Sequence, residues 1–425
     1  MIITVITFLL VLSLLVFVHE LGHYLGARAV GVKVLEFSIG FPPKVFGKKV
    51  GETEYMLGAI PIGGYVRLLG QDPSDEDPEQ PGNYAGKSKI QRFVILVAGP
   101  LMNLLFCWLI FSFMFMTGVE RYAYLGTPAK VASAESGTAA ASSGLLHGDV
   151  IIAVDGLPTK NWMEVESRLA ENSSIVQLQV MRKGQRLNIE IDHGFSGKKG
   201  FGLAPWVSPV LGQLAPGFPA DLAGLETRDL IVTIGGQKIT QWNDITSTLQ
   251  KTKDSDVEIV VSREGQLVSV RLNPVLSQSG TNYIIGVNQP TDRQSFGFSE
   301  SASKGYNQAV SLSHKTLDLV GKLFTGRASI DSLGGPIMIA QTVGKAAKNS
   351  SSELLAWMGF ISLQLGIFNL LPIPALDGGH IMFLILEAIL GKPLKQAVRE
   401  KIQLIGFSTL LLLIIYISIQ DIIRL

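Results

Sequence analysis

Residues 1–23 read MIITVITFLLVLSLLVFV-HELGH, an apolar stretch that ends in His19-Glu20-Leu21-Gly22-His23. None of the 18 residues before the motif carries a charge. Positions four apart share one face of a helix, so His19 and His23 can reach the same metal ion. Glu20 then lies beside that ion, as metal-assisted hydrolysis requires. Two histidines and an acid are destabilising at membrane depth unless they have partners, so this placement indicates chemistry within a bilayer.

The apolar residues of the chain are gathered in blocks. Of its 425 residues 47% are hydrophobic and 17% charged, with a mean hydropathy of +0.33. A helix that crosses a bilayer needs about 20 residues. Runs without Asp, Glu, Lys or Arg that reach or approach this length are Met1–Val18, Phe93–Val119, Leu354–Leu376 and Ile402–Gln420. They predict a polytopic α-helical membrane protein with four transmembrane helices. The first is a retained span, since no basic residue precedes it.

Charge indicates the orientation and excludes one class of partner. Basic residues such as Lys48 and Lys49 follow the first run, and others such as Lys392 and Lys395 follow the third. Short basic connections stay in the cytoplasm, which places both termini and the long central region outside. A net charge of +1 implies no nucleic-acid partner. Cys107 is the single cysteine, so no internal disulfide forms.

The central region contains a duplication. Residues 144–156 (GLLHGDVIIAVDG) are echoed by residues 224–236 (GLETRDLIVTIGG), and Trp162 and Trp242 keep the same offset. Each copy continues with a strand, a charged turn ending in glycine and another strand. The pattern predicts two small α+β domains.

A catalytic zinc usually has three protein ligands, so the histidine pair needs one more. The candidates are Asp377, His380 and Glu387, in and after the segment 369–380 (NLLPIPALDGGH). The first and third spans both run inward, and His19 and Asp377 lie near their cytoplasmic ends. This similar depth favours Asp377, and His380 is its main rival. Two prolines before Asp377 predict a break in the helix.

Two further segments are candidates for substrate contacts. Asn369 precedes Asp377 by about two helical turns; it either contacts the substrate backbone or the developing oxyanion, or caps the broken helix. Gly63, Gly64, Tyr65 and Val66 belong to a turn-and-strand pattern on the metal's side of the membrane. An exposed strand edge there could hold an extended substrate by main-chain hydrogen bonds. A hairpin with only a packing role is the alternative.

The duplicated region resembles tandem PDZ domains of the circularly permuted bacterial type, with Pro216–Ala220 ahead of the second copy and the looser Glu135–Ala140 ahead of the first. The whole chain resembles the site-2 protease family of intramembrane zinc metalloproteases. The resemblance rests on His19–His23, on Asn369–Gly379 with its Leu-Asp-Gly core, and on the PDZ-like pair; Gly99–Asn103 also matches a family pattern. It implies that His19, His23 and Asp377 bind one Zn²⁺ per chain, that Glu20 is the catalytic acid and base, and that a β-hairpin re-enters the membrane.

The expected organisation is a membrane protein with that β-hairpin and two extracytoplasmic α+β PDZ domains. Its predicted parts are a first transmembrane helix with the HExxH motif (1–30), a cytoplasmic-side loop with the hairpin (31–92), a second helix (93–119), two PDZ domains (120–205 and 206–291), amphipathic linker helices (292–353), a third helix with the Leu-Asp-Gly motif (354–390) and a fourth (391–425).

The expected function is an intramembrane endopeptidase that cuts single-span membrane proteins in the inner membrane of a bacterium. The resemblance implies an anti-sigma factor of the envelope stress response and signal-peptide remnants as substrates, with the active site near the cytoplasm and the PDZ domains in the periplasm. Those domains bind peptide C-termini or filter substrates by size. Two alternatives are a membrane zinc peptidase of another family, with a glutamate as third ligand, and a non-catalytic membrane-tethered PDZ scaffold.

Overall fold

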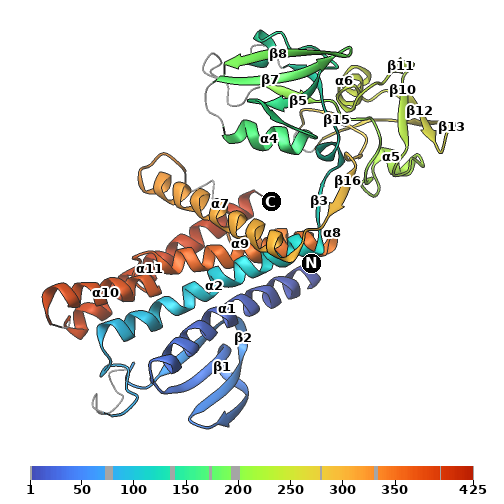
Figure 1. The fold of residues 1–425 in the computed structure, drawn as a ribbon. Coiled ribbons are helices and arrows are strands. Elements are labelled where there is room, and N and C mark those ends of the chain that lie inside the picture. The colour runs from blue at the N-terminus through green and yellow to red at the C-terminus, as the bar shows by residue number, and fades with distance from the viewer. Residues whose placement is uncertain are drawn as a thin grey trace. The chain divides into compact units, whose positions relative to one another are not determined.

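The computed structural model of the chain divides into two compact units, Met1–Val119 with Ser295–Leu425, and Glu120–Gln294 (Figure 1). Residues 135–138, within the PDZ signature expected in the first copy, lie outside the described residues. The described residues are 2–71, 80–134, 139–171, 175–192, 202–277, 280–329, 334–392 and 394–424.

Four helices of the first unit are long and apolar enough to cross a membrane. They are α1 (Ile2–Ala29), α2 (Lys89–Thr117), α9 (Ser351–Leu370) and α11 (Gln396–Ile423). Their outward faces carry large exposed apolar side chains, such as Leu404 and Leu412 of α11. Such faces are unfavourable in water and suit contact with lipid. The expected polytopic helical architecture is therefore present.

Helices α1 and α2 approach closely through small residues. A Cβ atom on Gly22 would lie 2.3 Å from the carbonyl oxygen of Ala98, and one on Gly26 would lie 2.9 Å from the Ala98 Cβ. Small residues allow helix backbones to meet in this way inside a membrane. The N-terminus of α2 is fixed by a capping box between Ser88 and Gln91.

Helix α2 also packs against α9 around Cys107, Phe111 and Leu363, which are almost completely buried. Across this contact Ser362 Oγ donates a hydrogen bond to the backbone carbonyl of Asn103 at 2.8 Å. Two amphipathic helices complete the unit, α7 (Phe298–Phe324) and α8 (Pro336–Asn349). The result is a bundle in which α2 is the central helix, in contact with α1, α7, α9 and α10.

A short non-helical segment separates α9 from α10 (Asp377–Leu390). Pro372 and Pro374 lie in the break, where a proline cannot donate a helical hydrogen bond. A Cβ atom on Gly378 would lie 2.0 Å from the carbonyl oxygen of Leu371, so only glycine fits there. The tight turn makes Asp377 the first residue of α10.

Strands β1 (Val34–Val50) and β2 (Thr53–Leu68) form a bent hairpin. Residues 36–39 pair with 54–57 and also with 64–67, and residues 46–49 pair with the far side of 54–57. Four short segments therefore lie in the order 64–67, 36–39, 54–57, 46–49. Among the described residues, no further strand covers the outer edge of 64–67.

The second unit contains the duplication, and the two copies share a succession of short helix, strand, short strand, longer helix and two paired strands. Strands β3 (Val119–Tyr122) and β16 (Thr291–Gln294) pair near the ends of this unit, with a 3₁₀ turn η1 (Ala123–Gly126) after β3. The first copy consists of β4 (Ala129–Ala134), α3 (Ala139–Ser142), β5 (Val150–Val154), β6 (Leu157–Pro158), α4 (Trp162–Glu171), β7 (Ile175–Arg182), β8 (Gln185–Asp192) and β9 (Leu203–Pro205). The second consists of α5 (Pro219–Leu222), β10 (Leu230–Ile234), β11 (Gln237–Lys238), α6 (Trp242–Thr252), β12 (Val257–Arg263), β13 (Gln266–Leu272), β14 (Val275–Leu276) and β15 (Tyr283–Ile284).

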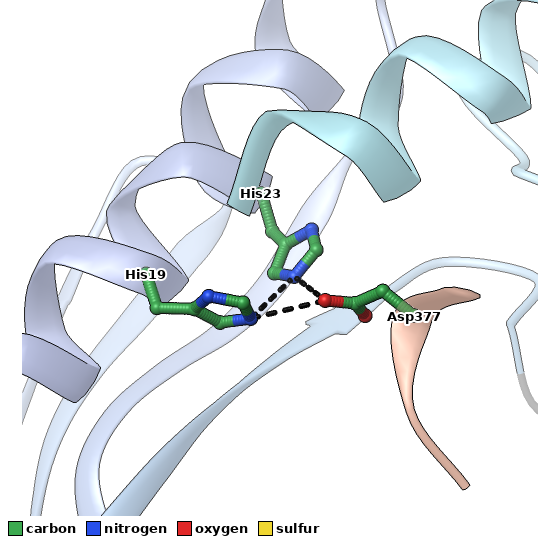
Figure 2. A group of neighbouring side chains, drawn as sticks. All are labelled: His19, His23 and Asp377. Atoms are coloured by element: carbon green, nitrogen blue, oxygen red, sulfur yellow. Dashed lines mark hydrogen bonds and ion pairs between the residues drawn. The ribbon is translucent and has the colours of Figure 1, made fainter. Parts of the chain in front are cut away.

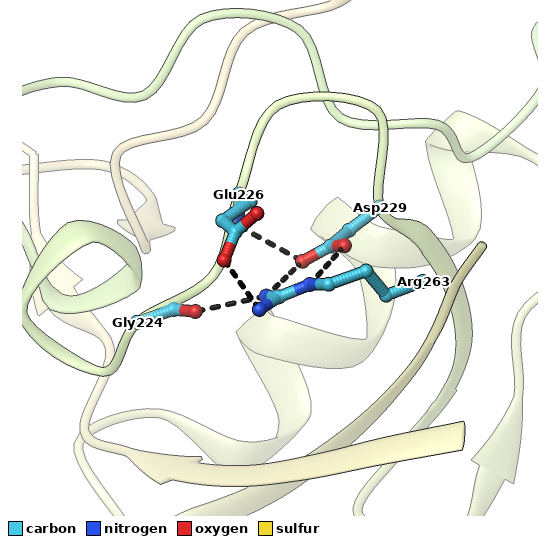
Figure 3. A network of polar contacts seen from close by, with 4 residues as sticks. All are labelled: Gly224, Glu226, Asp229 and Arg263. Carbon is cyan, nitrogen blue, oxygen red and sulfur yellow. Dashed lines mark hydrogen bonds and ion pairs between the residues drawn. The ribbon is translucent and has the colours of Figure 1, made fainter. Parts of the chain in front are cut away.

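A buried ion pair repeats in the two copies, and Figure 3 shows the pair of the second copy. Arg263 donates from Nε and Nη2 to the two carboxylate oxygens of Asp229 at 2.9 and 2.7 Å, and Arg182 binds Asp149 in the same way. Burial would raise the pKa of the Asp229 carboxyl, but the bonds from Arg263 and from the Glu226 backbone N–H outweigh it and hold that pKa below its usual range. The pair ties the start of β10 to the end of β12.

Candidate active site

Three side chains from two distant segments meet in the first unit. His19 and His23 lie one turn apart on α1, and their Nε2 atoms are 3.2 Å apart. Oδ2 of Asp377, at the start of α10, lies 3.1 Å from Nε2 of His19 and 3.4 Å from Nε2 of His23. The two imidazoles and the carboxylate point toward one another (Figure 2). All three side chains are at least four-fifths buried, with exposed fractions of 11, 13 and 17%.

The spacing of these atoms suits a tetrahedral metal ion. Zinc binds imidazole nitrogen and carboxylate oxygen at about 2.0–2.2 Å, so two ligands at tetrahedral angles are separated by about 3.3–3.5 Å. The observed separations of 3.1, 3.2 and 3.4 Å fall close to this range. The two Nε2 atoms and Oδ2 of Asp377 each have a lone pair directed at the same point, and a cation bound there would interact favourably with all three. The donor set therefore fits a zinc ion.

Helix α2 holds the two imidazoles from behind. Nδ1 of His23 lies 2.8 Å from the carbonyl oxygen of Ile95 and donates to it, which leaves the Nε2 lone pair for the metal. Gly99 faces the same ring, and a Cβ atom there would lie 2.3 Å from Nε2 of His23. Nδ1 of His19 is 3.3 Å from the side-chain amide of Asn103, which is completely buried. These α2 contacts set the directions of both rings.

Glu20 projects from α1 toward the hairpin. A Cβ atom on Gly64 would lie 3.4 Å from Cγ of Glu20. Ser13 Oγ donates to the carbonyl of Pro61 at 2.9 Å and helps to fix β2 against α1. The acid is thus placed between the histidine pair and the strand segment 64–67.

The other hairpin residues singled out in the sequence lie along the same segment. Tyr65 Oη donates to Glu36 Oε2 at 2.9 Å. Gly63 has a φ of 134°, and a Cβ atom there would meet the ring of Phe41 at 2.3 Å. Gly63 is therefore required by both its backbone conformation and its close contact.

The rival ligands lie elsewhere. Nε2 of His380 is 3.4 Å from Nε2 of Gln403, and His380 is not part of the histidine–aspartate group. Glu387 is buried near Arg92, at 3.8 Å, and its backbone carbonyl accepts from Lys89 Nζ at 3.0 Å. Asn369 is half-buried near the end of α9.

The supporting contacts from α2 cannot be assigned from the sequence. Gly99 and Asn103 stand there only within a pattern, and Ile95 gives no signal, because a backbone carbonyl that accepts from a histidine can belong to any residue type. Only the packing of α2 on α1 reveals these contacts.

The second unit has an apolar groove beside α6. Its walls are formed by Phe218 before α5, Trp242, Ile245 and Leu249 of α6, and Ile285 after β15, around a volume of about 330 Å³. Apolar side chains from one helix and one strand segment give it the character of a binding groove.

A histidine pair, a carboxylate and a neighbouring glutamate within a bundle of apolar helices define a membrane-embedded metallopeptidase. The comparisons agree. A profile of peptidase family M50 matches residues 7–413, and the chain belongs to this family.

Relatives of similar length come from several bacteria. The chain is 30% identical over 436 residues to the regulator of sigma-E protease RseP of Escherichia coli, covering 96% of this chain and 95% of that protein. It is 32% identical over 432 residues to the zinc metalloprotease RasP of Bacillus licheniformis, with 99% of both chains covered. A regulator of sigma E protease of Haemophilus influenzae is 30% identical over 447 residues, covering 99% of this chain and 98% of that protein.

Proposed function

We propose that the chain is an intramembrane zinc endopeptidase that cleaves single-span membrane proteins, with one Zn²⁺ held by His19, His23 and Asp377. The observation that carries the proposal is the meeting of three ligand atoms within 3.4 Å of one another, between helices apolar enough to lie in a bilayer. Relatives named zinc metalloproteases support the choice of metal.

When bound, zinc polarises the scissile carbonyl and activates water for attack. Glu20 receives the proton of the attacking water and delivers it to the leaving amine, work that typically accelerates such reactions by about 10²–10⁴-fold. Its Cγ atom lies 3.4 Å from the Cβ position of Gly64, which places the carboxylate beside the strand 64–67. Asn369, near the end of α9, contacts the substrate backbone or the developing oxyanion.

The substrate binds as an added strand on residues 64–67. A transmembrane helix hides its peptide bonds in its own hydrogen bonds, so it must open before it can be cut. The outer edge of 64–67 offers main-chain partners next to Glu20 and can replace the helical hydrogen bonds that are lost. Gly64, Tyr65 and Val66 belong to this edge, and Gly63 directly precedes it.

A cross-linking experiment tests this binding mode. A photoreactive side chain placed at Tyr65 should cross-link to a bound single-span substrate, whereas the same group at Lys48, on the opposite edge of the hairpin, should not. Equal cross-linking at both positions would argue against strand addition.

For the rest of the chain we propose the following organisation, which the sequence and the relatives support. Residues 120–205 and 206–291 form PDZ domains in the periplasm, and the metal site lies near the cytoplasmic side of the inner membrane. The repeated elements support the domain assignment, and the groove beside α6 is of a kind that could accept a peptide C-terminus. The relatives named as regulators of sigma-E support an anti-sigma factor as substrate. Helix α7, between the second copy and α9, links these domains to substrate entry.

Variants of the site test the enzymatic proposal in the purified full chain. Glu20→Gln should retain zinc and lose cleavage of a model single-span substrate. Asp377→Ala should lose both, whereas Glu387→Ala should keep its zinc. Full cleavage by Glu20→Gln would overturn the protease assignment, and cleavage that survives Asp377→Ala would point to a different third ligand.

A further inference from the structure

The buried amide of Asn103 faces the ring of His19 with the wrong atom for a metal-bound histidine. Its Nδ2 lies 3.3 Å from Nδ1 of His19, and its Oδ1 is buried without a hydrogen-bond partner. Nε2 of His19 faces the carboxylate of Asp377. Nε2 of His19 is thus directed at the metal site, and Nδ1 is directed at Asn103.

Binding of a metal decides which atom of Asn103 must face the ring. A neutral imidazole carries one proton, and a metal at Nε2 requires that proton on Nδ1. Nδ1 then donates, so its partner must be an acceptor. If Nδ2 stayed where it is, two N–H donors would oppose each other at 3.3 Å in a buried site.

We infer that Asn103 is a positioning residue for the zinc site, whose side-chain amide turns by 180° so that Oδ1 accepts the Nδ1–H of His19. The two amide termini have nearly the same size, so the turn needs no displacement of neighbours. The turn gives Oδ1 a donor and moves Nδ2 to the position that Oδ1 leaves, so its benefit lies in the contact with the ring. It also fixes the ring and increases the basicity of the ligand nitrogen, as carboxylate and carbonyl partners do for metal-bound histidines.

The backbone of Asn103 is held within helix α2 and receives one further contact from α9. Its carbonyl accepts from Ser362 Oγ of α9 at 2.8 Å, and the residue is completely buried. The amide therefore stands on a rigid helix between α1 and α9. His23 is supported in the parallel way by the carbonyl of Ile95, so both imidazoles would donate to oxygen atoms of α2.

This inference rests on the proposed zinc site, and its test separates the two. Zinc affinity is measured by competition with a chromophoric chelator in the purified full chain, for the wild type, Asn103→Asp and Asn103→Leu. Asp keeps an acceptor and removes the donor, whereas Leu has a similar volume and offers neither. The visible spectrum of the cobalt-substituted protein reports the ligand geometry independently of activity, and the unfolding temperature of the zinc-free protein reports folding.

Asn103→Leu should bind zinc about 10–100-fold more weakly than wild type. Asn103→Asp should retain wild-type affinity and the wild-type cobalt spectrum. Ser362→Ala, which removes the backbone contact alone, is the matched control and should also bind normally. Undiminished affinity in Asn103→Leu, or an equal loss in Asn103→Asp and Asn103→Leu, would overturn the acceptor role. Absence of zinc from the wild type would overturn the proposed function itself.

Discussion

Gly99 is the position at which the smallest possible change should disable the site. A Cβ atom there would lie 2.3 Å from Nε2, 2.7 Å from Cε1 and 2.8 Å from Cδ2 of His23. Optimal contacts between such atoms are about 3.5 Å, so Gly99→Ala requires the ring to retreat by about 1 Å. The ring cannot swing away freely, because its Nδ1 is bonded to the Ile95 carbonyl at 2.8 Å.

A His23 ring displaced by about 1 Å should coordinate zinc weakly. We expect Gly99→Ala to weaken zinc binding by about 10–100-fold and to lower cleavage by at least about 10²-fold. Alanine favours helix over glycine by about 1 kcal/mol, so helix propensity alone would not destabilise α2. The assays are zinc retention under a chelator challenge, cleavage of a single-span substrate in detergent, and the unfolding temperature.

Gly321→Ala is the matched control for this change. Gly321 lies in helix α7 of the same unit, and nothing stands within 4 Å of the Cβ position. It should bind zinc and cleave normally. If Gly99→Ala did the same, α2 would not constrain His23 as the geometry requires, and the reasoning would be refuted.

Three further predictions concern other parts of the chain. Arg263→Met leaves the buried Asp229 carboxylate without its main partner and should lower the local free energy of unfolding, measured by hydrogen exchange, by about 3 kcal/mol. Arg271→Met, in an exposed pair, is the control and should change this free energy by less than about 0.5 kcal/mol. Equal effects of the two variants would contradict the account. Because the pKa of Asp229 is lower in the folded than in the unfolded state, its contribution is complete above about pH 4 and is lost as the pH falls through the folded pKa. Protection of the second copy should decline there in wild type and less in Asp229→Asn, and identical profiles would refute this. Asp421→Ala removes the acceptor for two backbone N–H groups at the start of α8 and should raise exchange there by an amount equivalent to about 1–2 kcal/mol, whereas Asp318→Ala, in an exposed pair, should leave α8 unchanged.

Much of the architecture could be predicted because its signals are local. Uncharged runs of membrane length are visible in the sequence alone, and the duplication repeats similar residue types at the same spacing, with identical residues at Gly144 and Gly224 and at Asp149 and Asp229. The sequence also predicts that His19 and Asp377 lie at a similar depth, because the first and third spans run in the same direction and each residue lies near the end of its span. The two prolines before Asp377 marked the helix break for a covalent reason that needs no tertiary information.

The contacts between helices could not be predicted in the same way. Which face of α2 meets α1 depends on the absence of side chains at Gly22 and Gly99, and glycines in an apolar run have several possible meanings. The bend that leaves 64–67 at an edge of the hairpin depends on pairing registers that no local pattern specifies. Asn103 illustrates the limit, since a buried amide acquires its role only from the ring that faces it.

The central claim is that one zinc ion is shared by a histidine pair and an aspartate from distant helices. Zinc-edge X-ray absorption of the purified full chain, with the metal content per chain, tests it most directly. We expect one zinc per chain, with two imidazole nitrogens and a carboxylate oxygen at about 2.0–2.2 Å, and loss of that zinc in Asp377→Ala. A zinc shell that is unchanged in both His23→Ala and Asp377→Ala would contradict the account.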